Sequence, residues 1–245
     1  MNVMANNKIA MWSGPRNIST ALMYAFNSRS DTFCIDEPLY SYYLSNTKIT
    51  HPGRQEIIDN YEWDINKLID KICGDIPNEK SIYYQKHMAH HILPETPIEW
   101  ILKLKNCFLI REPKDVIYSL SKKIDDIKIE STGLIEQNKL FNKINELGKN
   151  TPIVIDSRDI LRNPEYMMKR LCKELEIPFE TSMTSWPEGK KDCDGIWAKH
   201  WYGEVWKSTK FNKYIKKEIS LSEQHINLYY ECKILYDELF KFRII

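Results

Sequence analysis

Residues 8–26 read KIAMWSGPRNISTALMYAF, and the rest of the chain is organised around this stretch. A short apolar run ends at Trp12, a tight segment with Gly14 and Pro15 follows, and an apolar, helix-compatible run begins at Ala21. The pattern predicts a strand, a loop and a helix in succession. Because glycine and proline favour turns, the loop would bring the start of the helix close to the end of the strand.

The predicted loop carries groups that suit an anion. The free N–H groups and the dipole at the start of a helix favour negative charge, and Ser19 and Thr20 stand where that helix would be capped. Arg16 adds a planar fork of donors for phosphate or sulfate oxygens. The alternative is an ordinary turn with a surface arginine. A nucleoside-triphosphate loop is not predicted, because that motif needs a second glycine followed by Lys and then Ser or Thr.

Length and composition limit the class of protein. The 245 residues fit one α/β domain or at most two small ones, and we expect a single domain over residues 1–245. Hydrophobic residues make up 42% and charged residues 28% of the chain, which is typical of a globular protein. The formal net charge of +1 argues against nucleic acid as a partner, but not against a local phosphate site.

The cysteines and the hydropathy pattern indicate where the protein is found. Six cysteines are scattered without CxxC spacing, which predicts reduced thiols and a cytoplasmic location. The N-terminal residues lack the apolar core of a signal peptide, and no apolar run is long enough to cross a membrane. We therefore expect no membrane partner. Nothing in the sequence indicates an oligomeric state.

A second strand–cation–helix unit follows residues 100–110. The apolar strand ends at Ile110, Arg111 comes next, and Pro113 suits the first turn of a helix. Ser119 then lies about two turns into that helix, given its 3.6 residues per turn. A second unit so similar to the first is what a divided phosphate site would need.

Two further predicted strands end in residues that could act as a base. Asp36 and Glu37 follow an apolar run and precede Pro38, at the edge of a parallel sheet where ligands bind, although they could also be two solvated acids at a turn. The strand predicted over residues 81–86 leads into a histidine-rich segment that begins at His87. A surface cluster and a metal site are the alternatives for these histidines. We expect no metal, because no cysteine or carboxylate follows at ligand spacing.

The other segments complete a coarse prediction. In chain order we expect a tyrosine-rich lid or substrate loop with helical segments from residue 40 onward, a charged helical segment over 122–150, a strand over 151–156, an amphipathic helix over 166–176, a loop rich in Trp and Lys over 181–213, and a final amphipathic helix over 222–240.

Four stretches, taken in order, resemble the sulfotransferase family. GPRNIST (14–20) is similar to its 5′-phosphosulfate loop, and LIREPKDVIYSL (109–120) is similar to its 3′-phosphate motif. IDSRDILRNPEYMMKRLCKELEIPF (155–179) is similar to a strand–helix segment of the family, and GEVWKSTKF (203–211) is a weaker likeness of its Gly-x-Trp-Lys cofactor loop. A Glu-Pro-Leu run and a Lys-His-Met run also resemble a bacterial branch described as sulfotransferase-like.

The resemblance implies a fold, a reaction and a cofactor site. The fold would be three-layer α/β/α with a central parallel sheet, like that of P-loop nucleoside triphosphatases. The reaction would be sulfuryl transfer from 3′-phosphoadenosine 5′-phosphosulfate (PAPS) to a hydroxyl or amine of a small-molecule acceptor, with 3′-phosphoadenosine 5′-phosphate (PAP) as product and no metal required. The implied cofactor-binding residues are Gly14, Pro15, Arg16, Asn17, Ile18, Ser19, Thr20, Arg111 and Ser119, with Lys199 and Lys207 as weaker candidates.

The same resemblance offers two candidates for the catalytic base. Many members have a histidine after a Lys-x-His strand, which His87 approaches although Lys86 is adjacent to it, and other branches use a glutamate beside a proline, here Glu37. We rank His87 slightly ahead of Glu37, and Glu37 could also orient His87. Arg16 would stabilise the charge on the leaving phosphate. A small-molecule kinase that uses ATP and a non-catalytic nucleotide-binding protein are the alternative functions.

Overall fold

The structure, a computed structural model, describes residues 7–148, 150–216 and 218–245. Its centre is a five-stranded sheet in the order β2-β3-β1-β4-β5, and every neighbouring pair is parallel. The strands are β1 (Asn7–Ser13), β2 (Thr32–Asp36), β3 (Ile82–Met88), β4 (Lys105–Ile110) and β5 (Ile153–Asp156). The predicted parallel sheet is therefore confirmed.

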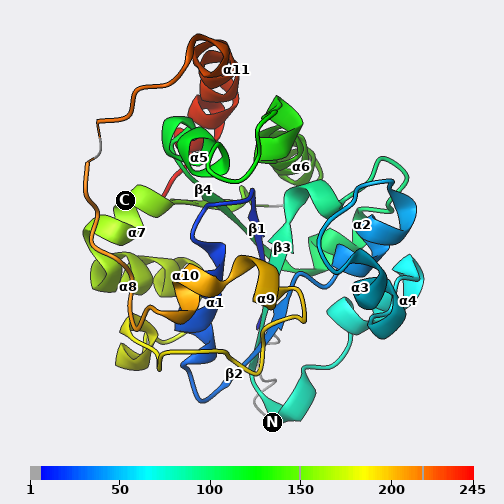
Figure 1. Ribbon diagram of the computed structural model, residues 1–245. Coiled ribbons are helices and arrows are strands. Elements are labelled where there is room, and N and C mark those ends of the chain that lie inside the picture. Colours follow the sequence, from blue (N-terminus) through cyan, green and yellow to red (C-terminus); the bar gives the residue numbers. More distant parts are fainter. Residues whose placement is uncertain (1–6, 149, 217) are drawn as a thin grey trace.

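Helices cover both faces of the sheet, which gives the predicted three layers (Figure 1). Side chains alternate along a strand, so Trp12 packs into one core cluster and Met11 into the other. One face is covered by α4 (Ile65–Cys73), α5 (Pro113–Leu120), α6 (Leu134–Leu147) and α11 (Glu223–Phe240), and the other by α1 (Ser19–Asn27), α7 (Ser157–Arg162) and α8 (Pro164–Glu174).

Shorter helices stand beside the carboxyl ends of the strands. They are α2 (Tyr40–Asn46), α3 (Arg54–Asn60), α9 (Ala198–Trp201) and α10 (Gly203–Trp206). Side chains from these four segments and from their neighbours form a third apolar cluster. The loop predicted over 181–213 thus includes two helical turns. No helix in the described ranges has both the length and the apolar character that a membrane span requires.

Two predicted boundaries were wrong in ways that affect the site. β3 does not end at residue 86, because its pairing with β1 continues to Ser13 and Met88, and His87 therefore lies inside the strand. The segment 122–150 is an α-helix only from Leu134 onward; a 3₁₀ turn at Ile129–Thr132 and Gly133 come before it. This late start places the beginning of α6 against the loop after β1.

Gly14 shows how tightly that loop is packed. A Cβ atom at Gly14 would lie 2.2 Å from the carbonyl oxygen of Thr132, which is backbone and cannot rotate away. We expect Gly14→Ala to lower the free energy of unfolding by about 1–3 kcal/mol, as overpacking does. Urea unfolding measures this loss. Gly203→Ala is the control, since no atom lies within 4 Å of its Cβ position; equal losses in both variants would contradict the prediction.

Candidate functional site

The two predicted strand–cation–helix units meet at the carboxyl edge of the sheet. Arg16 Nε donates a hydrogen bond to Ser119 Oγ at 2.8 Å, and Arg111 Nη1 donates one to the backbone oxygen of Arg16 at 2.7 Å. The contact follows from the topology, because β1 and β4 are neighbours and each unit leaves its strand at the same edge. Three residues predicted from two separate motifs therefore form one group.

The loop after β1 has an unusual backbone. Arg16 and Ile18 have positive φ angles of 64° and 62°, and Asn17 anchors the loop by donating from Nδ2 to Leu109 O at 3.1 Å. Ile18 is the N-cap of α1 and makes no side-chain cap. Ser19 and Thr20 do not cap the helix, as the sequence had suggested, but are its first two residues.

The absence of a cap leaves the start of α1 suited to an anion. The first N–H groups of a helix have no partner within it, and neither a side-chain cap nor an acidic residue in the first turn is found there. The dipole of the helix adds a partial positive charge. The first turn of α1 therefore offers backbone N–H donors that phosphate oxygens could accept from.

The charges in this group also fit an anion. Burial lowers the pKa of Arg111, and the neighbouring guanidinium of Arg16 acts in the same direction. Asp115 is only a loose partner, at 3.9 Å from Arg111 Nε. Among the described residues no carboxylate lies within ion-pair distance of Arg16. Two adjacent guanidiniums with so little counter-charge form a donor set that fits the oxygens of a phosphate or sulfate group.

A buried charge network lies at the ends of β2 and β3. Lys86 Nζ contacts Asp36 Oδ1 at 2.9 Å, Glu37 Oε1 at 2.5 Å and the hydroxyl of Tyr202 at 2.9 Å, and Lys86 is only 1% exposed. The Tyr202 hydroxyl donates to Asp36. Burial raises the pKa of Glu37 and Asp36 acts in the same direction, whereas Lys86 opposes the shift. Glu37 is thus a carboxyl group with raised basicity, held by a lysine.

Removing the lysine from this network tests its importance for folding. Lys86→Met leaves Asp36 and Glu37 without their counter-charge, and we expect a loss of about 3–5 kcal/mol in the free energy of unfolding, as for other broken buried ion pairs. Denaturant unfolding measures it. The control is Lys169→Met, whose partner Glu165 is on the surface; that change is expected to cost about 1 kcal/mol or less. A Lys86→Met protein as stable as the control would contradict the network.

His87 lies on the other side of the sheet. It is 1% exposed, its ring stacks on Trp12 with a centroid distance of 4.3 Å, and Nε2 lies 3.1 Å from Gln85 Oε1. Burial lowers its pKa to about 3, so the imidazole is neutral. Glu37 contacts Lys86 and not His87, so the suggested Glu37–His87 pair is not formed. Of the two candidate bases, Glu37 lies in the charge network at the ends of β2 and β3, whereas His87 is enclosed on the opposite face of the sheet.

The two lysines that were weaker candidates for cofactor binding both form ion pairs with glutamates. Lys199 forms an ion pair with Glu56 at 2.6 Å, and Lys207 forms one with Glu204 at 3.2 Å. Both lysines are exposed. Their contribution to cofactor binding stays a prediction.

Sequence reasoning singled out Asp36 and Glu37 but missed their pairing with Lys86, and it missed Tyr202 altogether. A lysine within an otherwise uncharged strand is a usable signal, because a fully buried lysine almost always has a charged partner. Tyr202 gave no such signal. It lies 166 residues from Asp36 in the chain, and only the fold brings them together.

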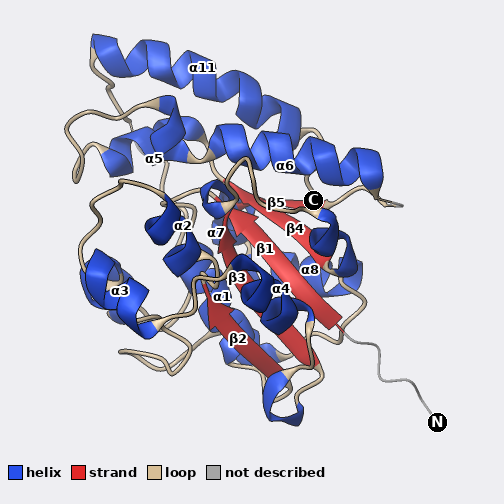
Figure 2. Ribbon diagram, turned by 90° about the vertical axis from the view of Figure 1, so that its right-hand side faces the viewer, coloured by secondary structure: helices blue, strands red, loops and turns tan. Residues whose placement is uncertain are grey.

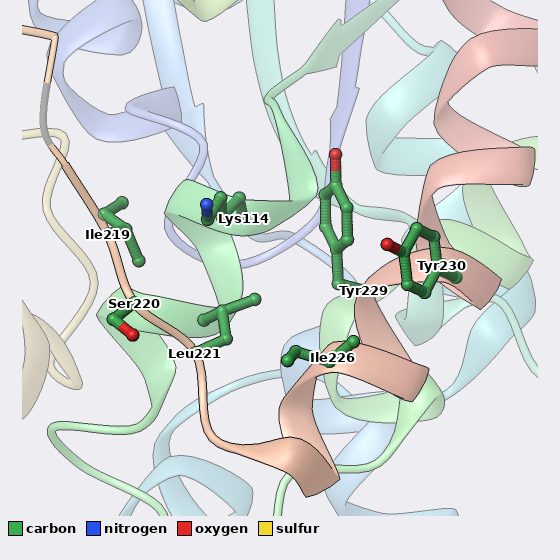
Figure 3. Close-up of a pocket in the computed structure, with 7 residues that line it drawn as sticks. All are labelled: Lys114, Ile219, Ser220, Leu221, Ile226, Tyr229 and Tyr230. Atoms are coloured by element: carbon green, nitrogen blue, oxygen red, sulfur yellow. The ribbon is translucent and has the colours of Figure 1, made fainter.

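A surface pocket lies outside this site, between the start of α5 and α11 (Figure 3). Its volume is about 280 Å³. It is lined by Lys114, Ile219, Ser220, Leu221, Ile226, Tyr229 and Tyr230, none of which is a predicted site residue. Over the ranges that the structure describes, no group of three His, Cys, Asp or Glu residues is arranged to hold a metal ion.

Comparisons with known sequences agree with these motifs. The sequence model of one family, described as Sulfotransferase domain, matches residues 7–221. Branched-chain-amino-acid aminotransferase-like proteins 2 and 1 of Arabidopsis thaliana are each 35% identical over 232 residues. Those matches cover 94% of this chain but 41% of each plant protein, so the chain spans about two fifths of the length of these relatives.

Two solved structures share the fold. The sulfotransferase domain from the curacin biosynthetic pathway superimposes with a TM-score of 0.60 at 16% identity, covering 93% of this chain and 97% of that one. A sulfotransferase from Alicyclobacillus acidocaldarius also has a TM-score of 0.60, at 11% identity, with 98% of each chain covered. At these identities the likeness shows the fold alone.

Proposed function

The chain belongs to the sulfotransferase domain family, and we propose that it transfers a sulfuryl group from PAPS to a hydroxyl or amine of a small-molecule acceptor. The observation that carries this proposal is the direct contact between the two anion motifs through Arg16, Arg111 and Ser119. A donor with two separate phosphate groups needs two such motifs at a fixed spacing. A kinase loop would need the Gly-Lys-Ser/Thr sequence that this chain lacks.

The two motifs divide the binding of the donor. PAPS, when bound, supplies the activated sulfuryl group. Arg16, the first N–H groups of α1 and the hydroxyls of Ser19 and Thr20 stabilise the negative charge on the leaving 5′-phosphate. Arg111 and Ser119 hold the 3′-phosphate and so fix the register of the nucleotide. No residue in this set needs a metal ion for its role.

Glu37 acts as the base on the acceptor side. Sulfuryl transfer, like phosphoryl transfer, depends mainly on positioning and on stabilising charge. Glu37 takes the proton from the acceptor as the new bond to sulfur forms and the bond to the phosphate oxygen breaks. Lys86 donates to the Glu37 carboxylate and opposes the rise in its pKa, whereas Asp36 contacts Lys86 and adds to that rise. Both residues act through Glu37 and not on the acceptor.

Backbone strain supports this placement. Of the six non-glycine residues with positive φ in the described part of the chain, three belong to the proposed site, namely Arg16, Ile18 and Glu37. Such conformations are costly for residues with a Cβ and are concentrated at functional sites. The strain is found on both sides of the reaction, in the phosphate loop and at the base.

Calorimetric titration with PAP, 5′-AMP and ATP–magnesium tests the proposal. We expect PAP to bind much more tightly than 5′-AMP, because only PAP has the 3′-phosphate that Arg111 and Ser119 would hold. Preferential binding of ATP–magnesium would support the kinase alternative instead. If none of the three ligands binds, the proposed reaction is contradicted and a non-catalytic role is the better reading.

A further inference from the structure

The hydroxyl of Tyr202 lies inside the buried charge network at the carboxyl ends of β2 and β3, beside which Figure 2 shows α2. It accepts a hydrogen bond from Lys86 Nζ at 2.9 Å and donates one to Asp36 Oδ2 at 2.7 Å. All three residues are buried. The oxygen and the proton of the hydroxyl are therefore both used within the network.

This arrangement uses every donor of Lys86. A lysine ammonium has three N–H donors, and the three acceptors are Asp36 Oδ1, Glu37 Oε1 and the hydroxyl oxygen of Tyr202. Asp36 and Tyr202 are also bonded to each other, so together they fix the directions of two N–H bonds. Because the bonds of an ammonium group keep tetrahedral angles, the third direction is then fixed as well, and it points to Glu37.

Tyr202 reaches this network from outside the sheet. It joins α9 to α10, and its backbone N–H donates to Ala198 O at 2.8 Å. The backbone N–H of Gly195, seven residues earlier, donates to Asp36 Oδ2 at 3.3 Å. The segment 195–202 is thus attached to the end of β2 at two points, and Asp36 is the acceptor at both.

The α10 helix that follows Tyr202 is attached to α1. The indole Nε1 of Trp206 donates to Asp194 Oδ2 at 2.9 Å, and the hydroxyl of Tyr24 on α1 donates to Asp194 Oδ1 at 2.8 Å. Figure 1 shows α10 beside α1. Tyr202 is therefore held at a fixed place between α1, whose first turn would bind the 5′-phosphate, and the network that contains Glu37.

We propose that Tyr202 is a positioning residue, whose hydroxyl fixes Asp36 and Lys86 so that Lys86 holds the Glu37 carboxylate in one orientation toward the acceptor. The inference rests on the proposed function for the role of Glu37 as the base. The hold of the hydroxyl on the surroundings of Glu37 exists whether or not any reaction takes place. Tyr202 does not supply a proton to the acceptor, because its proton is donated to Asp36.

The titration of Glu37 tests this hold without an assay of activity. Carbon-13 NMR follows the labelled carboxyl, which is assigned by its absence in Glu37→Gln. Tyr202→Phe keeps the ring and removes the hydroxyl, so Asp36 loses a donor and draws Lys86 more strongly, and Glu37 loses part of its counter-charge. We expect the midpoint of the Glu37 titration to rise by about half a pH unit to one pH unit, the size of one hydrogen bond.

A second buried tyrosine supplies the control. Tyr236 is 1% exposed, and its hydroxyl donates to the carboxylate of Asp156, away from Glu37. Tyr236→Phe removes the same chemical group and is expected to leave the Glu37 midpoint unchanged. Tyr40 of α2 also faces Glu37, whose charge adds to the effect of burial in raising the pKa of Tyr40. It keeps its hydroxyl in both variants, so it does not account for a difference between them.

Turnover tests whether this hold positions the base. We expect Tyr202→Phe to lower kcat about tenfold or more, because a base that is poorly aimed reacts slowly, while calorimetry gives the same affinity for PAP as the unmodified protein. Tyr236→Phe is expected to keep kcat. A Tyr202→Phe protein with a raised midpoint and an unchanged kcat would overturn the positioning role.

The two proposals fail in different ways. If the unmodified protein neither binds PAP nor transfers a sulfuryl group, and Tyr202→Phe still raises the Glu37 midpoint, sulfuryl transfer is contradicted and the hold of Tyr202 on Glu37 is supported. PAP binding and transfer, with the midpoint and kcat both unchanged in Tyr202→Phe, would overturn the Tyr202 inference alone.

A near-isosteric replacement covers the case in which Tyr202→Phe does not fold. The amino acid 3-fluorotyrosine, placed at position 202, keeps the ring and the hydroxyl but makes the hydroxyl a stronger donor to Asp36. Asp36 then draws Lys86 less, and the Glu37 midpoint is expected to fall, because Lys86 favours the charged carboxylate. A midpoint that stays in place or rises would overturn the inference.

Discussion

Arg111→Ala is expected to reduce the affinity for PAP by a factor of about 100 or more while changing the affinity for 5′-AMP by no more than a small factor. The guanidinium would make two charge-assisted hydrogen bonds to the 3′-phosphate, each contributing about 1.5–3 kcal/mol, and every 1.4 kcal/mol is a factor of about ten. The ligand 5′-AMP lacks that phosphate and so cannot lose the interaction. Calorimetric titration of both ligands gives the ratio directly.

The 5′-AMP titration is needed because Arg111 has a second role. It donates to the carbonyl of Arg16, so its removal could loosen the phosphate loop as well as the 3′-phosphate site. A loosened loop would weaken both ligands equally, and that outcome would contradict the assignment. Arg170→Ala is the matched control, because Arg170 pairs with Glu174 on α8 and its removal should leave both affinities unchanged. Unchanged PAP affinity in Arg111→Ala would also contradict the assignment.

The meeting of the two strand–cation–helix units could be predicted because their sequence signals are local. Arg16 and Arg111 each follow a buried run within a few residues, and the turn and helix signals after them are strong. Two units that leave parallel strands must end at the same edge of the sheet. Their direct contact needed only that the two strands be neighbours, which the structure shows.

The surroundings of His87 could not be predicted in the same way, because side chains alternate between the two faces along a strand and the predicted strand ended too early. The sequence placed the end of β3 at residue 86, and a histidine beyond a strand end is free to turn toward a ligand. The strand continues to Met88, so His87 must point away from the face that Lys86 occupies. Because β3 is two residues longer than predicted, the alternation of its side chains fixes the face of the sheet on which His87 lies. The partners of Lys86 come from β2 and from Tyr202, and long-range pairings of this kind leave no periodic signal.

Glu37→Gln is expected to lower kcat/KM by about 10²–10⁴-fold, the usual contribution of a general base, while PAP affinity stays unchanged. Glutamine keeps the shape of the side chain and cannot accept the proton.

The pH profile of the activity adds a second readout. The carboxylate is the active form and exists above its pKa, and because burial raises the pKa of Glu37, activity should rise with pH through a midpoint above the ordinary glutamate value. Transfer from labelled PAPS to a mixed panel of alcohols and amines supplies the acceptor for these assays.

His87→Gln is the variant that separates the two candidate bases. Losing the ring that stacks on Trp12 should lower stability, but each folded molecule should keep the turnover of the unmodified protein. If His87 were the base, its pKa of about 3 would place the rise in activity below the ordinary glutamate range, and His87→Gln would abolish transfer while Glu37→Gln would not. The pH at which activity rises and the identity of the variant that loses activity thus depend on one physical fact. That fact is which side chain lies on the side of the sheet that meets the acceptor.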